Sequence, residues 1–208
     1  MHELKILQPE LIIGDYSHAD FYDAFKHIAP TVILSYDHDW RIPHLKIAEL
    51  VGRETEARHT IADSEVKAAA VKKIINQMSS PQRVTVMQVM NDHVMLQGTI
   101  NHPLNTLLYT ELGLAPGKHV PLNKMRLELF TPDIPPLETE KLWIRLYSDQ
   151  PEIAQVLRNM QNLPYWGSID AVRNNQVRYI SNWFIMSWTP QGRSQIMDEV
   201  LGYLRVDG

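Results

Sequence analysis

Three histidines occupy positions at which a ligand could bind. His18, His38 and His102 each follow a segment that we expect to form a strand. Three imidazoles that met at one point could hold a bare zinc or manganese ion. The sequence contains nine scattered histidines, and each of these three could equally be an exposed or hydrogen-bonded loop residue. Direct binding of a metal ion is therefore a hypothesis that the sequence leaves open.

Signatures of catalysis are missing from the sequence. Cysteine is absent, which removes thiol nucleophiles, thiolate metal ligands and disulfides together. The nine glycines form neither of the phosphate-binding patterns GxGxxG and GxxxxGK[ST]. The HExxH and GxSxG patterns are also absent, and no carboxylate pair stands out by its spacing. We therefore expect a binding protein rather than an enzyme.

Side chains suited to ligand binding cluster after the expected strands. In open α/β folds, ligands lie beyond the carboxyl ends of the strands. Arg126 is a further candidate because cations are scarce at these positions, although its connection is rich in Pro and Leu. The candidate ligand-binding residues are Tyr16, His18, His38, Trp40, Gln97, His102, Arg126, Tyr147, Tyr165 and Trp183. Trp143, in contrast, alternates within a strand pattern and is expected in the core.

The first fifty residues predict alternating helices and strands. A short helix precedes two apolar runs, Leu11–Ile13 and Thr31–Leu34, which are typical of buried parallel strands. Between the two runs, Phe21, Phe25 and Ile28 recur at helical spacing. Residues 4–35 therefore predict a parallel strand pair with a helical crossover.

A long helix is expected from Glu54 to Met78, a segment without Pro or Gly. One stripe of this helix is apolar and consists of Ala57, Ile61, Ala68, Val71, Ile75 and Met78. At 1.5 Å per residue the helix is roughly 37 Å long, which is longer than a small domain is wide. Its length suits it to join two lobes.

Strands and helices alternate again after residue 80. The expected strands are 84–89, 94–96, 142–146 and 177–180, and the expected helices are 104–112, 151–160 and 192–204. The fold class is therefore α/β. We predict three parts: a partial N-terminal α/β lobe at 1–53, an inter-lobe helix at 54–80 and a C-terminal α/β lobe at 81–208.

The composition is that of an ordinary folded domain. The chain has 208 residues, of which 44% are hydrophobic and 21% are charged, and its net charge is −4. This net negative charge argues against nucleic-acid binding by this segment, because phosphate recognition needs basic surfaces. No stretch reaches the roughly 18 apolar residues that cross a bilayer.

Several segments, in order along the chain, resemble segments of one protein family. Leu7–Ile13 is similar to the family segment "L-K-P-D-L-I-I", and Ile28–Val32 is similar to "I-A-P-T-V". Trp40 with Ile47–Ala57 is similar to the segment that leads into the family's rigid inter-lobe helix. Three later family segments are similar to Leu107–Leu114, Trp166 with Ile169–Val177, and Asp198–Leu201. The chain thus resembles the class III substrate-binding proteins of iron–siderophore, haem and cobalamin importers.

This resemblance implies two Rossmann-like lobes joined by one long helix, with a ferric siderophore bound between them without catalysis. The protein would be the binding component of an ABC iron-uptake system and would have no intrinsic cofactor. The family's first strand–helix–strand unit precedes the segment that Leu7–Ile13 resembles, so we expect an incomplete N-terminal lobe. Its open sheet edge could be completed by another molecule, including a second copy.

One departure from the family affects the choice of partner. Importer-coupled members usually carry a glutamate on each lobe that contacts arginines of the permease. The aligned positions hold His2, with Glu3 adjacent, and Pro132, with Asp133 adjacent. The same domain also occurs in AraC-type transcription regulators, where it senses siderophores. An importer component would be an extracytoplasmic lipoprotein, whereas a regulator domain would be cytoplasmic.

The resemblance also bears on the ligand. A large planar chelate needs aromatic faces and, if it is anionic, cations. Arg41, Arg126 and Arg178 are the candidate cations, and Arg178 alternates with apolar residues as a strand surface charge would. With so few cations, we expect a near-neutral hydroxamate to fit better than a highly charged triscatecholate.

Overall fold

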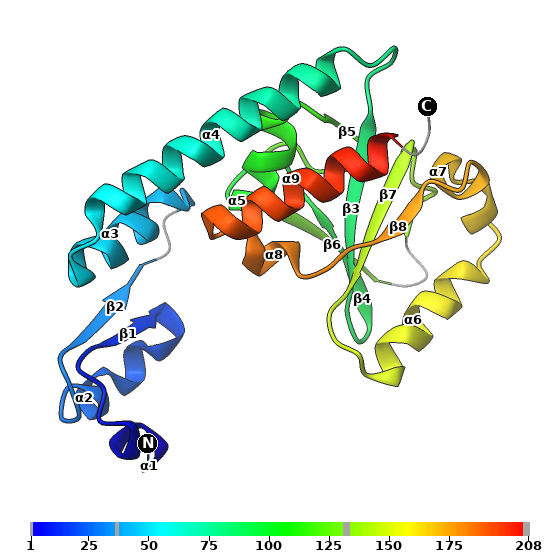
Figure 1. Cartoon of the computed structure of the whole chain (residues 1–208). Coiled ribbons are helices and arrows are strands. Elements are labelled where there is room, and N and C mark those ends of the chain that lie inside the picture. The colour runs from blue at the N-terminus through cyan, green and yellow to red at the C-terminus, as the bar shows by residue number, and fades with distance from the viewer. Residues whose placement is uncertain (1, 36–37, 131–133, 206–208) are drawn as a thin grey trace. The chain divides into compact units, whose positions relative to one another are not determined.

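A computed structural model describes residues 2–35, 38–130 and 134–205. Pro132 and Asp133, at one expected permease contact, lie outside these ranges. The chain forms two compact units, Met1–Ile61 and Ala62–Gly208, and each unit is α/β. The boundary between the units falls within helix α4, which is continuous from Glu54 to Asn76 and agrees closely with the expected helix (Figure 1). Within the described ranges, no helix has both the length and the apolar character to span a membrane.

The first unit contains a two-stranded parallel sheet. Strand β1 pairs with β2 from Ile12↔Thr31 to Asp15↔Leu34, as the sequence predicted. The elements before α4 are α1 (His2–Leu7), β1 (Ile12–Asp15), η1 (Tyr16–Phe21), α2 (Tyr22–Phe25), β2 (Thr31–Leu34) and α3 (Arg41–Val51).

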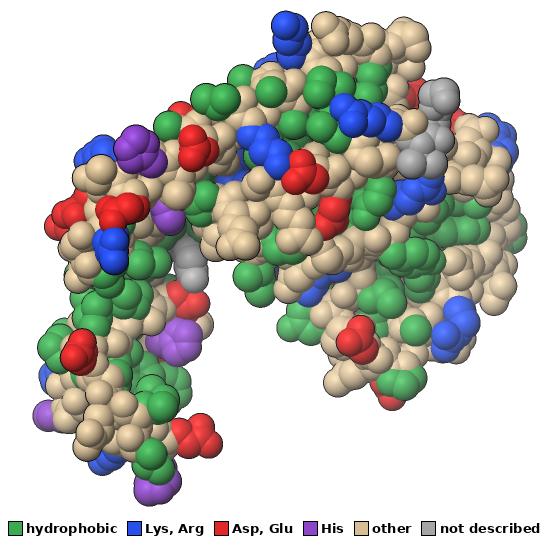
Figure 2. All heavy atoms as spheres, viewed as in Figure 1, with side chains coloured by type: hydrophobic (Ala, Val, Ile, Leu, Met, Phe, Trp, Pro, Cys, Tyr) green, Lys and Arg blue, Asp and Glu red, His purple; other side chains and the backbone are tan. Residues whose placement is uncertain are grey.

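The expectation that both strands are buried is wrong. No residue of β1 or β2 is buried, because among the described residues the sheet has two strands and both outer edges are unpaired. Hydrophobic side chains are correspondingly visible on the surface of this unit (Figure 2). Those exposed include Ile6, Leu7, Tyr16, Phe21, Ile42 and Val51. This unit buries little apolar surface of its own.

The second unit is built on a mixed sheet in the order β6-β4-β3-β7-β8, with the short β5 beside β3. Strands β3, β7 and β8 are parallel, whereas β4 is antiparallel to both β3 and β6. The strands are β3 (Arg83–Val89), β4 (His93–Gln97), β5 (Ala115–Pro116), β6 (Arg126–Phe130), β7 (Lys141–Leu146) and β8 (Val177–Tyr179).

Helices cover both faces of this sheet. One core cluster contains Val84, Val86 and Trp143 from the strands and packs against α4, η2, α8 and α9. The alternate strand residues Met87, Leu142 and Ile144 form the other cluster, with α6, η3 and α7. These elements are α5 (Pro103–Asn105), η2 (Thr106–Glu111), α6 (Pro151–Gln161), η3 (Trp166–Ser168), α7 (Asp170–Arg173), α8 (Trp183–Met186) and α9 (Pro190–Arg205).

A buried ion pair ties α9 to η2. The Arg193 side chain is 1% exposed and its guanidinium contacts the carboxylate of Glu111, whose side chain is 16% exposed. The same guanidinium donates to Ser64 of α4 at 3.4 Å. Segment η2 is a π-helix, in which the Leu112 amide reaches the Leu107 carbonyl at 2.8 Å. Its wider turn is compatible with the position of Glu111 opposite Arg193.

Replacing Arg193 with Ala should destabilise the protein strongly. The substitution leaves the Glu111 carboxylate without its main cation, and breaking a buried pair in this way costs about 3–5 kcal/mol. Urea-induced unfolding followed by circular dichroism measures the loss. The exposed pair between Arg173 and Asp170 provides a control, because Arg173→Ala should cost less than about 1 kcal/mol. Similar losses for both variants would contradict the role given to the buried pair.

Candidate functional site

A pocket of about 490 Å³ lies on the face of the second unit's sheet that carries Val86 and Trp143, beyond the apolar core. Its size is in the range of pockets that bind small molecules. It opens near the carboxyl ends of β3 and β7, and the antiparallel strands β4 and β6 extend its floor. It is lined by Gln88, Met90, His93, Met95, Gln97, His102, Met125, Arg126, Glu128, Arg145, Tyr147, Asn182, Phe184 and Ile185.

Strand register places the floor residues in rows. Gln88 of β3 is opposite Met95 of β4 and beside Arg145 of β7, and Met95 is in turn opposite Glu128 of β6. Because side chains alternate along a strand, the residues two positions away share the same face. The polar floor is therefore a direct result of the pairing of these four strands.

Four of the predicted ligand residues come together in this pocket: Gln97, His102, Arg126 and Tyr147. Gln97 ends β4 and is 1% exposed, and its buried amide nitrogen has no hydrogen-bond partner in the described structure. Gln88 is also buried, at 4%. A buried amide without a partner costs free energy, so a donor in this position is a candidate ligand contact.

His102 caps the helix that begins at α5. Its Nδ1 accepts a hydrogen bond from the Leu104 amide at 3.1 Å, and its ring makes edge contacts with Phe184 and Trp188. Asn105, which is fully buried, donates from its amide nitrogen to the carbonyls of Ile100 and Met125, each at 2.8 Å. These bonds fix the loop before α5 against the segment that leads into β6.

A close backbone approach at Gly98 holds β4 beside the segment before β6. The Gly98 amide donates to the Met125 carbonyl at 2.8 Å, and a Cβ at this position would lie 1.9 Å from the Lys124 carbonyl oxygen. A larger residue would push the two segments apart. Gln97 and Arg126 would then lose their common position on the pocket floor.

Arg145 is the cation that the sequence interpretation missed. Its guanidinium carbon lies 5.8 Å from the centre of the Tyr147 ring and 5.6 Å from that of Phe184. Burial lowers the pKa of Arg145, but arginine remains protonated in proteins. In the part of the chain that the structure describes, Arg145 forms no ion pair with a carboxylate. Arg145 and Tyr147 are two residues apart in a strand pattern, and this spacing could have indicated their common face.

Arg126 is not in an irregular connection, as the Pro- and Leu-rich sequence suggested. It begins strand β6, which was not predicted. Its Nε lies 3.2 Å from an Oε1 of Glu128, and both side chains are about half exposed. Glu128 was missed for the same reason, because β6 was not predicted although polar and apolar residues alternate from Arg126 to Leu129.

Trp183 and Tyr165 do not line this pocket, and their expected part in ligand binding stays a prediction. Trp183 is fully buried, its Nε1 donates to Glu199 at 2.7 Å, and its ring contacts Trp143 edge-on. Its neighbours Asn182 and Phe184 line the pocket instead. Tyr165 packs against the cluster on the opposite face of the sheet, where burial raises its pKa.

The remaining candidates belong to the first unit. Tyr16 is 79% exposed, and His18 follows it in η1, with its Nδ1 2.8 Å from the Asp15 carboxylate. A hydrogen bond from Ser17 is the largest cause that lowers the pKa of Asp15. His38 is an exposed loop residue. Trp40 is 2% exposed and packs near His44, so it is a buried residue of this unit.

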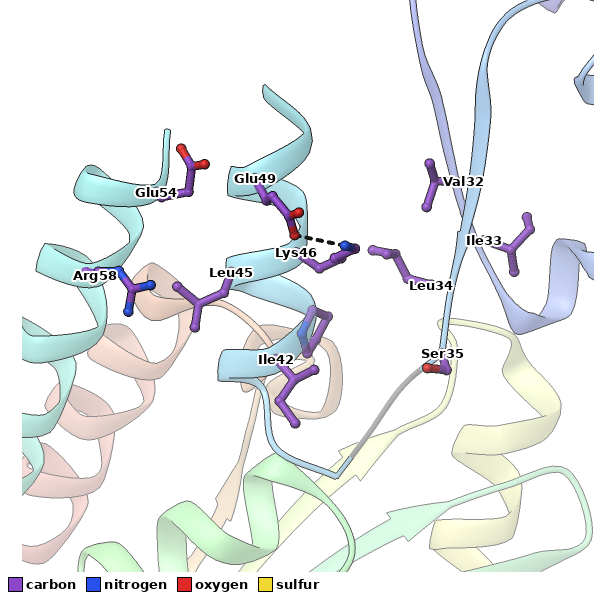
Figure 3. Close-up of a pocket in the computed structure, with 11 residues that line it drawn as sticks. Val32, Ile33, Leu34, Ser35, Ile42, Leu45, Lys46, Glu49, Glu54 and Arg58 are labelled. Carbon is purple, nitrogen blue, oxygen red and sulfur yellow. Dashed lines mark hydrogen bonds and ion pairs between the residues drawn. The ribbon is translucent and has the colours of Figure 1, made fainter. Parts of the chain in front are cut away.

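A larger cavity of about 720 Å³ lies in the first unit between β2 and α3 (Figure 3). Its walls combine apolar side chains with the polar residues Ser35, Lys46, Glu49, Glu54 and Arg58, of which Lys46 and Glu49 pair with each other at 2.8 Å. It contains none of the ten predicted ligand residues. We therefore interpret it as incomplete cover over the two-stranded sheet and regard the pocket of the second unit as the candidate site.

Comparison with known proteins agrees with this architecture. The sequence profile of the family described as "Periplasmic binding protein" matches residues 3–115, which is more than half of the chain. The chain belongs to the periplasmic binding protein family. This match, together with the relatives and the solved structure described next, confirms the class III iron–siderophore resemblance seen in the sequence, and proteins of this family are non-catalytic transport components.

Individual periplasmic binding proteins extend the comparison. The iron-uptake system-binding protein of Bacillus subtilis is 21% identical over 140 residues, which is 67% of this chain and 44% of that protein. The iron(3+)-hydroxamate-binding protein FhuD of Bacillus subtilis is 29% identical over 109 residues, or 52% of this chain and 35% of FhuD. The chain thus spans less than half the length of these relatives.

A solved structure shares the fold. The structure of Staphylococcus aureus SirA complexed with staphyloferrin B superposes with a TM-score of 0.75 at 19% identity, covering 98% of this chain and 74% of SirA. The expected α/β fold class is confirmed by this similarity and by the two α/β units.

Replacing Gln97 with Met should leave the ligand-free protein as stable as before, or more stable by up to about 1 kcal/mol. Methionine has a similar shape, and the substitution removes a buried amide that has no partner. In contrast, Asn105→Leu should cost about 1–3 kcal/mol, because the Asn105 amide makes two hydrogen bonds. Urea unfolding of both variants measures the difference. A large loss for Gln97→Met would indicate that Gln97 has a structural partner.

Proposed function

We propose that this chain binds a ferric siderophore as the substrate-binding component of an ABC iron-uptake system. The observation that carries the proposal is the pocket in which Gln97, His102, Arg126 and Tyr147 meet Arg145 beside the carboxyl ends of the parallel strands β3 and β7. In this family, such a site supports capture of a small molecule without catalysis. The names of the relatives, which refer to iron uptake and to iron(3+)-hydroxamate, support the same class of ligand.

The pocket provides the groups that a chelate needs and does not need to bind iron itself. The siderophore holds the iron, so protein metal ligands are unnecessary. Arg145 offers one positive charge to the oxygen-rich surface of the chelate, and Gln97 offers a buried amide donor. Tyr147, Phe184 and the methionines offer apolar and aromatic contacts.

The charges of the pocket favour a near-neutral chelate. Arg126 is balanced by Glu128, so Arg145 gives the described lining residues one net positive charge when the histidines are neutral. Three hydroxamates neutralise ferric iron, whereas three catecholates leave a net charge of −3. We therefore propose a hydroxamate-type siderophore as the preferred ligand.

Alternatives that the sequence left open have less support. Among the described residues, no group of three or more His, Cys, Asp or Glu side chains could hold a metal ion, which gives the zinc or manganese hypothesis no support. Siderophore sensing within an AraC-type regulator stays a prediction. The coding sequence upstream of this chain distinguishes import from sensing: a lipoprotein signal supports import, and a helix-turn-helix region supports sensing.

Partners and location follow from the import proposal. We propose an extracytoplasmic, membrane-associated lipoprotein that delivers its ligand to an ABC permease. Division of the chain into lobes 1–53 and 81–208, joined by residues 54–80, stays a prediction. Dimerisation through the first unit also stays a prediction, and the unpaired edges and exposed apolar side chains of the described β1–β2 sheet are compatible with it.

Replacing Arg145 with Ala should weaken binding of an uncharged ferric trihydroxamate about 10- to 100-fold, or about 1.4–2.7 kcal/mol. The substitution removes the cation that faces the chelate oxygens. Quenching of intrinsic tryptophan fluorescence during titration measures the affinity, and Gln97→Met should weaken binding as well.

A matched control is Arg158→Ala, which removes an exposed arginine of α6. Helix α6 packs on the opposite face of the sheet, so this variant should bind the chelate as the wild type does. Absence of binding to any ferric siderophore by the wild type would refute the proposed function. Equal losses for Arg145→Ala and Arg158→Ala would refute the position of the site.

A further inference from the structure

Glu128 lies in the pocket, and a contribution to the stability of the fold does not explain its presence there. Among the fourteen described residues that line the pocket, it is the single carboxylate. It lies on β6 at one end of the row that runs through Met95 and Gln88 to Arg145. With strands about 4.8 Å apart, three strand steps separate the backbones of Glu128 and Arg145 by about 14 Å.

The pair between Glu128 and Arg126 contributes little to folding. Their side chains are 46% and 45% exposed, and the Nε–Oε1 distance is 3.2 Å. Exposed ion pairs of this kind stabilise proteins weakly. The effect of Glu128 on the pocket is larger, because its charge cancels that of Arg126 on the floor. Without Glu128, the pocket would present two arginines at opposite ends of the same floor.

We propose that Glu128 sets the charge selectivity of the pocket, so that it disfavours polyanionic ferric chelates and leaves near-neutral ones unaffected. This inference rests on the proposed function and names the residue that selects among ferric chelates. A chelate large enough to contact Arg145 and cover the floor brings its outer oxygens toward β6. A net charge of −3 is repelled by the carboxylate there, whereas an uncharged chelate is not.

Glu128→Gln tests the proposal, since glutamine keeps the shape and removes the charge. Affinities for an uncharged ferric trihydroxamate and for a ferric triscatecholate of charge −3 are measured by calorimetry. The variant should bind the triscatecholate about tenfold more tightly, or about 1.4 kcal/mol, and the trihydroxamate within about twofold of the wild type. The gain should shrink at high salt, because half-exposed charges are screened.

Two further variants sharpen the test. Glu138→Gln makes the same change in net charge at an exposed residue outside the pocket, paired with Lys118, and should leave both affinities unchanged. Arg126→Gln should have the opposite effect to Glu128→Gln, weakening the triscatecholate more than the trihydroxamate. Unfolding midpoints of all three variants should match that of the wild type, because the substituted side chains are exposed.

The outcomes separate this inference from the proposed function. If the wild type binds neither chelate, the proposed function fails. If the wild type binds the trihydroxamate but Glu128→Gln leaves the ratio of the two affinities unchanged, the charge role of Glu128 alone fails. The same conclusion follows if Glu138→Gln changes the ratio equally, or if no variant binds the triscatecholate at all.

Discussion

Parallel pairing of β3 with β7 is the constraint on which the second unit depends. Six consecutive residue pairs, from Val84↔Lys141 to Val89↔Leu146, fix which side chains of both strands face each layer of helices. On one face, Val86 and Trp143 enter the core, and Gln88 and Arg145 follow them at the carboxyl ends. A shift of one residue would turn Arg145 into the opposite core and remove the site. Fold and pocket are therefore specified by the same register.

Much of this arrangement could be predicted from the sequence, because a strong apolar periodicity indicates the secondary structure of a segment. The apolar pattern of each such segment fits only one type of secondary structure, and this holds for helix α4, for strands β3 and β7 and for the hairpin that β4 forms with β3. The rule that ligands lie beyond strand ends selected Gln97, His102 and Tyr147, which line one pocket of the structure. The direction of a single side chain is harder to predict: Trp183 follows a strand as expected, but its ring packs against Trp143 because a short helix begins there.

Strand β6 shows the other limit of sequence interpretation. Its residues pair with β4 through backbone hydrogen bonds, and their side chains alternate between exposed and half-buried positions over only five residues, a run too short to stand out beside a Pro-rich connection. An edge strand of this kind is defined by its neighbour rather than by its own propensities. The pairing of Arg126 with Glu128 could therefore not be predicted from the sequence. The low burial of β1 and β2 depends on how many strands surround them, which the family resemblance indicated but the apolar runs themselves did not.

The π-helical turn at Thr106–Glu111 has a consequence for the ancestry of this chain. A π-turn holds one residue more than an ordinary helix would need over the same length. Loss of one residue there would restore the ordinary helix and leave the residues on either side in register. Loss of Glu111 itself, however, would remove the carboxylate that the buried guanidinium of Arg193 contacts. Descendants of this chain can therefore discard the wide turn at other positions of the segment at lower cost than at Glu111.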